Sequence, residues 1–154
     1  MDTEALILAV TALQAGLSRR ANIDMPAVQV SAGSLLALMG ALRQDERFAF
    51  DMLLDHTAID WIEQDRIELL YNLYSTTHGH YLMVSVSVPR ANPVAPTVST
   101  LWEIAQWQER EVYDLFGVRY ENHPDLRRLF LDDDWQGYPL RKDYKDEHML
   151  ELPQ

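Results

Sequence analysis

Acidic and histidine side chains in the last third of the sequence could support acid–base chemistry. Glu109 and Glu111 lie two residues apart, and His123 and Asp125 follow further along the chain. A free-standing enzyme could use these four side chains as its general acid and general base. Side chains two apart on a helix point about 200° away from each other, so the two glutamates cannot grip one metal ion together. The spacing favours a structural or interface role over catalysis.

Other catalytic and cofactor signatures are missing from the sequence. The 154 residues include no cysteine, which excludes thiolate catalysis, disulfides and Cys-ligated zinc or iron–sulfur clusters. There is no glycine-rich phosphate loop and no G-x-S-x-G motif. His78 and His80 could bind a metal ion as neighbours, but a solvated hairpin turn explains them better. We therefore expect no cofactor, no metal site and no catalytic residue.

The stretch from Arg110 to Lys145 favours a different role, because it mixes charged and aromatic residues without a lasting period. It holds seven of the 13 Lys and Arg residues of the chain. Guanidinium groups pair with carboxylates through two hydrogen bonds, and large aromatic side chains anchor protein interfaces. The predicted partner-interface residues are Glu109, Arg110, Arg127, Arg128, Phe130, Trp135, Arg141 and Lys142. Arg110 and Asp114, four residues apart, are expected to pair along a helix surface.

Charge and hydropathy limit the other partners. The formal net charge of -11 argues against non-specific binding to nucleic acid or anionic lipid. No apolar run is as long as a membrane span, and the first residues lack the basic start of a signal peptide. We expect a soluble, cytoplasmic chain that reaches a membrane only through partner proteins.

Hydrophobic periodicity predicts the elements that position these residues. A helix is expected over Thr3–Leu17, a strand over Ala27–Val30, and a second helix capped by Ser31. Its apolar stripe is Leu35, Leu38, Met39 and Leu42. Alternating apolar residues predict further strands over 48–54, 67–73 and 82–88, with a hairpin turn at 76–80.

A third helix is predicted over Leu101–Phe116. Thr100 and Glu103 would form its capping box, and Gly117 would end it. Val118–Tyr120 could add a short strand. The predicted fold class is α+β: an antiparallel or mixed sheet of about four strands packed against two or three helices. Residues 1–120 form the globular domain in this prediction, and residues 121–154 form an extended partner-binding arm that becomes ordered on docking.

The sequence from Phe48 to Tyr144 resembles a known family. The runs EREVYDLFGV (109–118), HPDLRR (123–128) and PLRKDY (139–144) are similar to the signature of the C-subunit of respiratory NADH-quinone oxidoreductase, complex I. Upstream, FDMLLDHTAIDW and IELLYNLYST extend the resemblance. The same family includes relatives in chloroplasts, in cyanobacteria and in membrane-bound hydrogenases.

The resemblance implies a role that composition does not show. Members are accessory subunits of the hydrophilic arm and carry no redox centre. They pack against the hydrogenase-large-subunit-like subunit that shapes the quinone site, next to iron–sulfur subunits. The chain would then be part of a translocating NADH:quinone oxidoreductase, inactive when isolated, on the cytoplasmic face of the bacterial inner membrane, or on the matrix or stroma side in an organelle. Alternatives are the equivalent subunit of a ferredoxin-dependent quinone oxidoreductase or of a membrane-bound hydrogenase.

Overall fold

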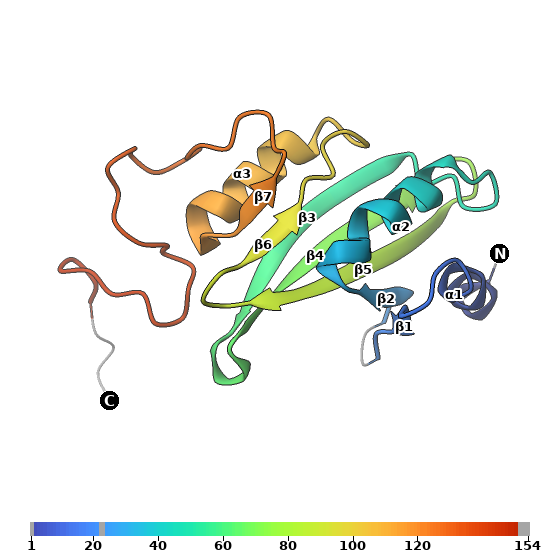
Figure 1. Ribbon diagram of the computed structural model, residues 1–154, viewed down its shortest axis with the longest axis horizontal. Coiled ribbons are helices and arrows are strands. Elements are labelled where there is room, and N and C mark those ends of the chain that lie inside the picture. Colours follow the sequence, from blue (N-terminus) through green and yellow to red (C-terminus); the bar gives the residue numbers. More distant parts are fainter. Residues whose placement is uncertain (1, 22–23, 151–154) are drawn as a thin grey trace.

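A five-stranded sheet in the order β1-β2-β5-β4-β3 forms the centre of the computed structural model, which describes residues 2–21 and 24–150 (Figure 1). Its strands are β1 (Ser18–Arg19), β2 (Ala27–Val30), β3 (Met52–Trp61), β4 (Arg66–Ser75) and β5 (His80–Pro89). The helices are α1 (Thr3–Thr11), α2 (Ala32–Gln44) and α3 (Ala105–Phe116), with a 3-10 turn at Ile62–Gln64. β6 (Val94–Pro96) and β7 (Arg119–Glu121) form a separate two-stranded sheet.

The β4–β5 hairpin supplies two of the interior strands of the sheet. Its ten-residue strands pair antiparallel from Arg66 with Pro89 to Ser75 with His80. Gly79 closes the turn at a φ of 65°, a conformation that glycine adopts without strain. β2 lies parallel to β5, and β3 pairs antiparallel with β4. The sheet is therefore mixed, and the predicted α+β fold class is confirmed.

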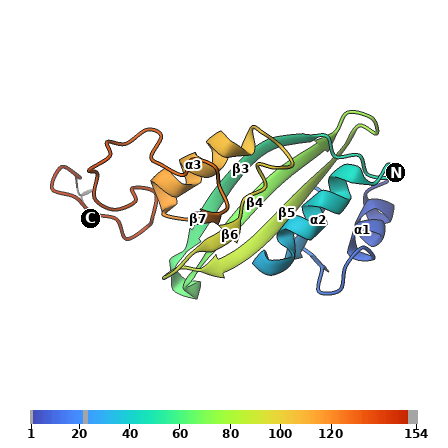
Figure 2. The same cartoon turned by 45° about the horizontal axis from the view of Figure 1, so that its top comes forward.

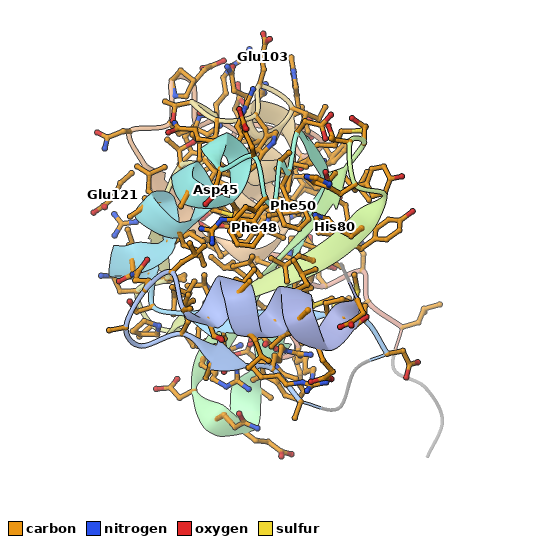
Figure 3. The ribbon with its side chains drawn as sticks, turned by 90° about the vertical axis from the view of Figure 1, so that its right-hand side faces the viewer. Asp45, Phe48, Phe50, His80, Glu103 and Glu121 are labelled. Carbon is orange, nitrogen blue, oxygen red and sulfur yellow. The ribbon has the colours of Figure 1, made fainter. Side chains whose placement is uncertain are left out.

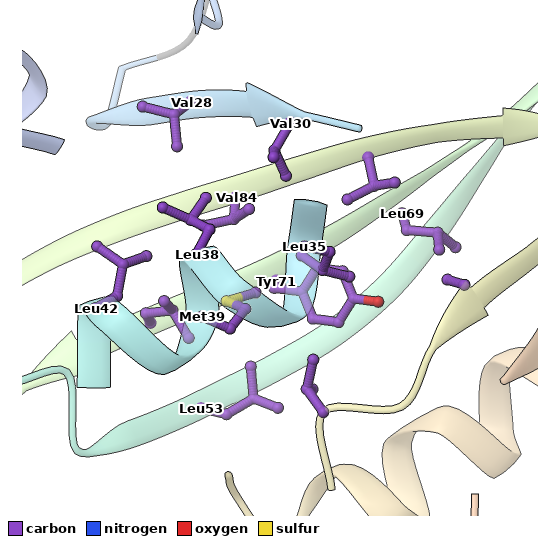
Figure 4. Close-up of a cluster of buried hydrophobic side chains, with 14 of the residues drawn as sticks. Val28, Val30, Leu35, Leu38, Met39, Leu42, Leu53, Leu69, Tyr71 and Val84 are labelled. Atoms are coloured by element: carbon purple, nitrogen blue, oxygen red, sulfur yellow. The ribbon is translucent and has the colours of Figure 1, made fainter. Parts of the chain in front are cut away.

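The apolar core lies between the sheet and α2. The predicted stripe of Leu35, Leu38, Met39 and Leu42 is fully buried and faces Tyr71, Leu69 and Val84 of the sheet (Figure 4). Burying such a side chain contributes about 1.5–3 kcal/mol. α3 and the β6–β7 pair lie on the same side of the sheet, beside α2 (Figures 1 and 2). This part of the second layer carries the candidate site.

The first long strand differs from the prediction. β3 begins at Met52 rather than Phe48, and an irregularity in register lies between Leu53 and Asp55. Leu53 is buried, while Met52 and Leu54 are exposed, so the buried positions already change phase between Phe50 and Leu53, before the irregularity. The bulge then leaves Leu54 and Asp55, two successive residues, exposed. Phe48 and Phe50 precede the strand in the core, and His80 lies against them (Figure 3).

Two predicted helices are shorter than their sequence patterns. α1 ends at Thr11 rather than Leu17, and the residues that follow form turns over 12–16, with Gly16 at a φ of 88°. α3 begins at Ala105 rather than Leu101, since residues 101–104 form tight turns. Its N-cap is Ile104 without a side-chain hydrogen bond, so the predicted capping box is not formed. Gly117 ends α3 in the left-handed conformation, as predicted.

Two short strands, β1 and β6, are not predicted by the sequence pattern. β1 has only two residues, too few for a period, and β6 lies in a proline-rich segment that predicts a stiff connection. Pro96 is the last residue of β6, which pairs with β7 alone, and sheet edges tolerate proline. Beyond β7 the chain runs over the surface. Within the described part of the arm, residues 121–150, no residue is buried as a whole, but the His123 side chain is covered and Leu126 packs against the core.

Candidate functional site

The candidate site is the contact between α3 and the arm. Three polar side chains of α3 are almost completely buried: Glu109 and Asp114 are 0% exposed, and Arg110 is 5% exposed. Burying a charged group without partners is strongly unfavourable, so each of the three must be satisfied inside the chain. Arg110 and Asp114 bond to the arm, and Glu109 bonds to residues that follow β6.

Arg110 and Asp114 both bind the backbone of the arm. The pair that is predicted between these two side chains is not formed. The Arg110 guanidinium donates to the carbonyls of Arg127 and Arg128, at 3.1 and 3.0 Å. The Asp114 Oδ2 accepts three successive backbone N–H groups, those of Leu129, Phe130 and Leu131, at 2.7–3.1 Å. One α3 face therefore satisfies both acceptors and donors of the arm backbone between residues 127 and 131.

Arg128 completes this arrangement, which we call the Asp114 clasp (Arg110, Asp114, Arg128 and the backbone of 127–131). Its guanidinium lies 2.8 Å from Asp114 Oδ1 and also donates to the carbonyls of Trp135 and Gly137. Burial alone would raise the pKa of Asp114, but the hydrogen bonds from Arg128 and from the three backbone groups hold that pKa below its usual value. The carboxylate stays ionised and keeps its acceptor role.

A second clasp fixes the arm further along. Asp60, near the end of β3, accepts two hydrogen bonds from Arg90, at 2.7 and 3.0 Å, and one from the backbone N–H of Lys142 at 2.9 Å. Arg90 also pairs with Asp143. Arg141 donates to the Phe116 carbonyl at 2.6 Å, where a cation is favourable near the C-terminal end of α3.

Tyr138 connects the two clasps. The guanidinium carbons of Arg128 and Arg141 each lie 5.3 Å from the centre of its ring. The same ring packs on Gly117, where an added Cβ would come within 2.5 Å of Tyr138. Gly117 is therefore required twice, once for its φ of 78° and once for the close approach of the arm.

The predicted interface residues divide into two groups. One group makes contacts within the chain: Glu109, Arg110, Arg128 and Arg141. Glu109 and Arg110 are the most buried of these and are not accessible to a partner at the surface. The others are accessible: Phe130 is 65% and Trp135 is 36% exposed, and Arg127 and Lys142 are exposed as well. Arg127 pairs with Asp125 at the surface.

Glu109 belongs to a buried polar cluster rather than to an open active site. Its carboxylate accepts from the Thr97 hydroxyl at 2.6 Å and from the Val98 N–H at 2.8 Å, and His123 Nε2 lies 3.8 Å away. Burial raises the pKa of Glu109 to about 7. The His123 side chain is 1% exposed, and Glu111 and Asp125 face solvent elsewhere. The four residues of the enzyme hypothesis therefore do not line one accessible site.

Sequence reasoning does not identify Asp60, Arg90 or Tyr138 as members of the site, and it identifies Gly117 only as a helix terminator. Asp60 and Arg90 lie far from the arm in sequence, so no spacing rule connects them to it. Within residues 2–21 and 24–150, no three His, Asp or Glu side chains are placed to hold a metal ion, and no helix is long and apolar enough to cross a membrane.

The fold and the two clasps define a small α+β protein with a C-terminal arm fixed to its third helix. The family profile described as "Respiratory-chain NADH dehydrogenase, 30 Kd subunit" matches residues 28–148, and the chain belongs to this family. The resemblance seen in the signature runs is thereby confirmed.

Relatives agree with this assignment. The chain is 43% identical over 129 residues to the NADH-quinone oxidoreductase C-subunit of Moorella thermoacetica, covering 84% of this chain and 86% of that protein. It is 49% identical over 98 residues to the corresponding C-subunit of Geobacter metallireducens, covering 62% of this chain and 60% of that protein.

Two solved structures share the fold. A chain of the membrane-bound sulfane sulfur reductase, an archaeal respiratory membrane complex, superposes with a TM-score of 0.79 at 25% identity, over 92% of this chain and 85% of that one. The trypsin-resistant fragment (1-134) of Nqo5 superposes with a TM-score of 0.67 at 29% identity, over 82% of this chain and all of the fragment.

Proposed function

We propose that this chain is a cofactor-free accessory subunit in the hydrophilic arm of a proton-translocating NADH-quinone oxidoreductase. The observation that carries the proposal is the arm: it is fixed by two clasps, yet Phe130, Trp135 and Leu140 are 65%, 36% and 52% exposed on it. A monomer gains nothing from holding large apolar side chains in water, whereas a partner protein can bury them.

The partner in this proposal is the hydrogenase-large-subunit-like subunit at the quinone site, together with neighbouring iron–sulfur subunits. The catalytic activity belongs to the complex, and the isolated chain has none. Attachment to the cytoplasmic face of the membrane is through these partners. The clasps act before assembly, because a preformed arm avoids much of the ordering entropy that a flexible segment loses on docking.

The division of the chain at residue 120 is part of the proposal. Residues 1–134 of Nqo5 form a trypsin-resistant fragment, which supports a protected domain followed by a more accessible segment. In this chain Arg127 is the most exposed basic residue of the Asp114 clasp region, with 67% of its side chain accessible. We expect trypsin to cut within the arm before it cuts within the domain.

A related complex with another electron donor is the second candidate. The likeness to a chain of the membrane-bound sulfane sulfur reductase extends over 92% of this chain, so the same fold occurs in a respiratory complex that reduces sulfane sulfur instead of quinone. Measuring which donor reduces the purified complex, NADH or reduced ferredoxin, separates the two candidates.

Affinity purification of the tagged chain from its native membranes tests the proposal. We expect a stoichiometric complex with quinone reductase activity, and we expect Phe130→Ser to lower the yield of that complex at high salt. Leu8→Ser on α1 is the matched control, since Leu8 is 69% exposed and lies away from the arm. A wild-type chain that purifies alone would refute the proposal. Equal yields from both variants would refute the arm as its docking surface.

A further inference from the structure

A groove next to the start of α3 is not explained by the arm. It has a volume of about 480 Å³ and lies between the first residues of β3 and the turn at 101–104. We call it the β3–α3 groove. Met52, Leu54 and Ile104 are 43%, 41% and 48% exposed along its walls, and Trp102 and Leu53 form buried parts of the lining.

The bulge in β3 shapes this groove. Between Leu53 and Asp55 the register shifts, so that two successive side chains, Leu54 and Asp55, both lie at the surface after the buried Leu53. β3 is also the last strand of its sheet, so this stretch has no strand on its outer side, and the Gln108 side chain of α3 bonds to the Leu54 carbonyl there, at 3.2 Å. Edge strands with exposed apolar residues are ready sites for an added peptide, and proteins normally protect them.

The apolar surface continues from the groove toward the arm. Trp107, one turn after Ile104, is 55% exposed, and the Arg110 guanidinium lies 5.1 Å from the centre of its ring. Arg110 in turn holds the arm at 127 and 128. A protein seated on the arm can therefore reach the groove along α3.

The charged residues around the β3–α3 groove indicate which kind of partner segment can bind there. Hydrogen bonds from the Thr76 side chain and backbone hold the pKa of Asp51 below its usual value, so Asp51 stays ionised. Glu103 is exposed and points away from the body of the protein (Figure 3). Arg43 is the cation of the rim, and its guanidinium lies 5.7 Å from the Trp102 ring. Two carboxylates against one guanidinium, in a chain of net charge -11, favour a basic partner.

We propose that the β3–α3 groove binds an extended segment of a neighbouring subunit that carries large apolar side chains and a lysine or arginine beside them. Its apolar side chains cover Met52, Leu54 and Ile104, and its cation faces Glu103 and Asp51. This inference rests on the proposed function, because it requires a complex, but it concerns a surface separate from the arm.

Site-specific photocrosslinking in the intact complex tests the inference. A photoreactive phenylalanine analogue replaces Ile104 in one strain and Tyr81 in another, where Tyr81 is 49% exposed on the β4–β5 hairpin and serves as the control. We expect position 104 to crosslink to one subunit, at a segment with a lysine or arginine next to apolar residues, and position 81 not to label that segment. Glu103→Lys should lower the position-104 crosslink about tenfold by repelling the cation. Glu111→Lys, on the exposed side of α3, should leave it unchanged.

The outcomes separate this inference from the proposed function. A complex that assembles normally but gives no crosslink at 104, a crosslink to an acidic segment, or a crosslink to a second copy of this chain overturns the groove assignment alone. Insensitivity of the crosslink to Glu103→Lys also overturns it. Absence of any complex refutes the proposed function itself.

Discussion

The α+β domain and the arm are held in place by different forces. In the domain, side chains such as Leu35, Leu69 and Tyr71 are fully buried, and apolar burial supplies the stability. In the described arm no residue is buried as a whole, although the His123 and Leu126 side chains pack against the domain. From residue 127 onward the position of the arm depends on hydrogen bonds to Asp114, Asp60 and Phe116. Hydrogen bonds to charged groups contribute about 1.5–3 kcal/mol each, so a few of them can fix a segment that has no core of its own.

The difference predicts that the arm can be released without unfolding the domain. Asp114→Asn replaces one acceptor oxygen with a donor that faces Arg128 and the N–H groups of 129–131. Breaking such a buried pair costs about 3–5 kcal/mol. Because local opening controls proteolysis, we expect trypsin to cut after Arg128 at least about a hundredfold faster, with little change in the melting of the domain.

Asp125→Asn is the control for this experiment. Its pair with Arg127 is exposed, and such pairs contribute about 0–1 kcal/mol. If Asp114→Asn and Asp125→Asn are cut at the same rate, the clasp does not hold the arm.

The domain should instead respond to pH through Glu109. Its pKa is about 7 in the fold against an ordinary 4.5, so the folded state binds the proton more tightly than the unfolded chain. The stabilisation is complete below pH 4.5 and is lost as pH rises toward 7, by about 3 kcal/mol at most. The Glu109→Gln side chain cannot ionise. In urea unfolding from pH 5 to 8, the free energy of unfolding of the variant should therefore increase relative to that of the wild type as pH rises.

The stability of the fold also depends on pH through His56, in the opposite direction. This contribution cancels when Glu109→Gln is compared with the wild type. Burial lowers the pKa of His56 to about 4, so its contribution to stability falls as pH drops from 6.5 toward 4. Both proteins contain His56, and their difference isolates Glu109. A constant difference across the pH range would show that Glu109 titrates normally.

Gly117→Ala should strain both regions at once. A left-handed backbone costs a non-glycine residue about 1–2 kcal/mol, and the new Cβ would displace the Tyr138 ring. We expect a lower melting temperature together with faster trypsin cleavage in the arm. Gly33→Ala on α2 is the control, because a Cβ there meets nothing within 4 Å.

The smallest effect on stability is expected at the exposed surface of the arm. Phe130→Ala removes a side chain that is 65% exposed, and surface substitutions of this kind usually change the free energy of unfolding by less than about 0.5 kcal/mol. Circular dichroism melting and trypsin resistance should match those of the wild type. A large loss of either would place Phe130 in the clasp rather than on a docking surface.

The sequence predicts the domain better than the arm, because apolar burial leaves a periodic pattern in the sequence and long-range hydrogen bonds do not. Alternation and helical spacing predict α2, β4 and β5, because those patterns record one-sided burial, and Gly117 is predicted because a helix end favours it. The bulge at Leu54 and the parallel pairing of β2 with β5 leave no periodic trace. The two clasps join side chains to backbone groups far away in sequence. The i,i+4 rule consequently gives Asp114 the wrong arginine, Arg110 in place of Arg128.

Hydrogen exchange of the isolated, monomeric chain tests the central claim most directly. Three backbone N–H groups, of Leu129, Phe130 and Leu131, donate to the buried Asp114 carboxylate. We predict that these three amides exchange about a hundredfold more slowly than those of Asp132–Asp134 in the wild type, and that Asp114→Asn abolishes the difference. Exchange of all arm amides at the rate of an unfolded chain in the wild type would contradict the clasp and would show that the arm becomes ordered only on its partner.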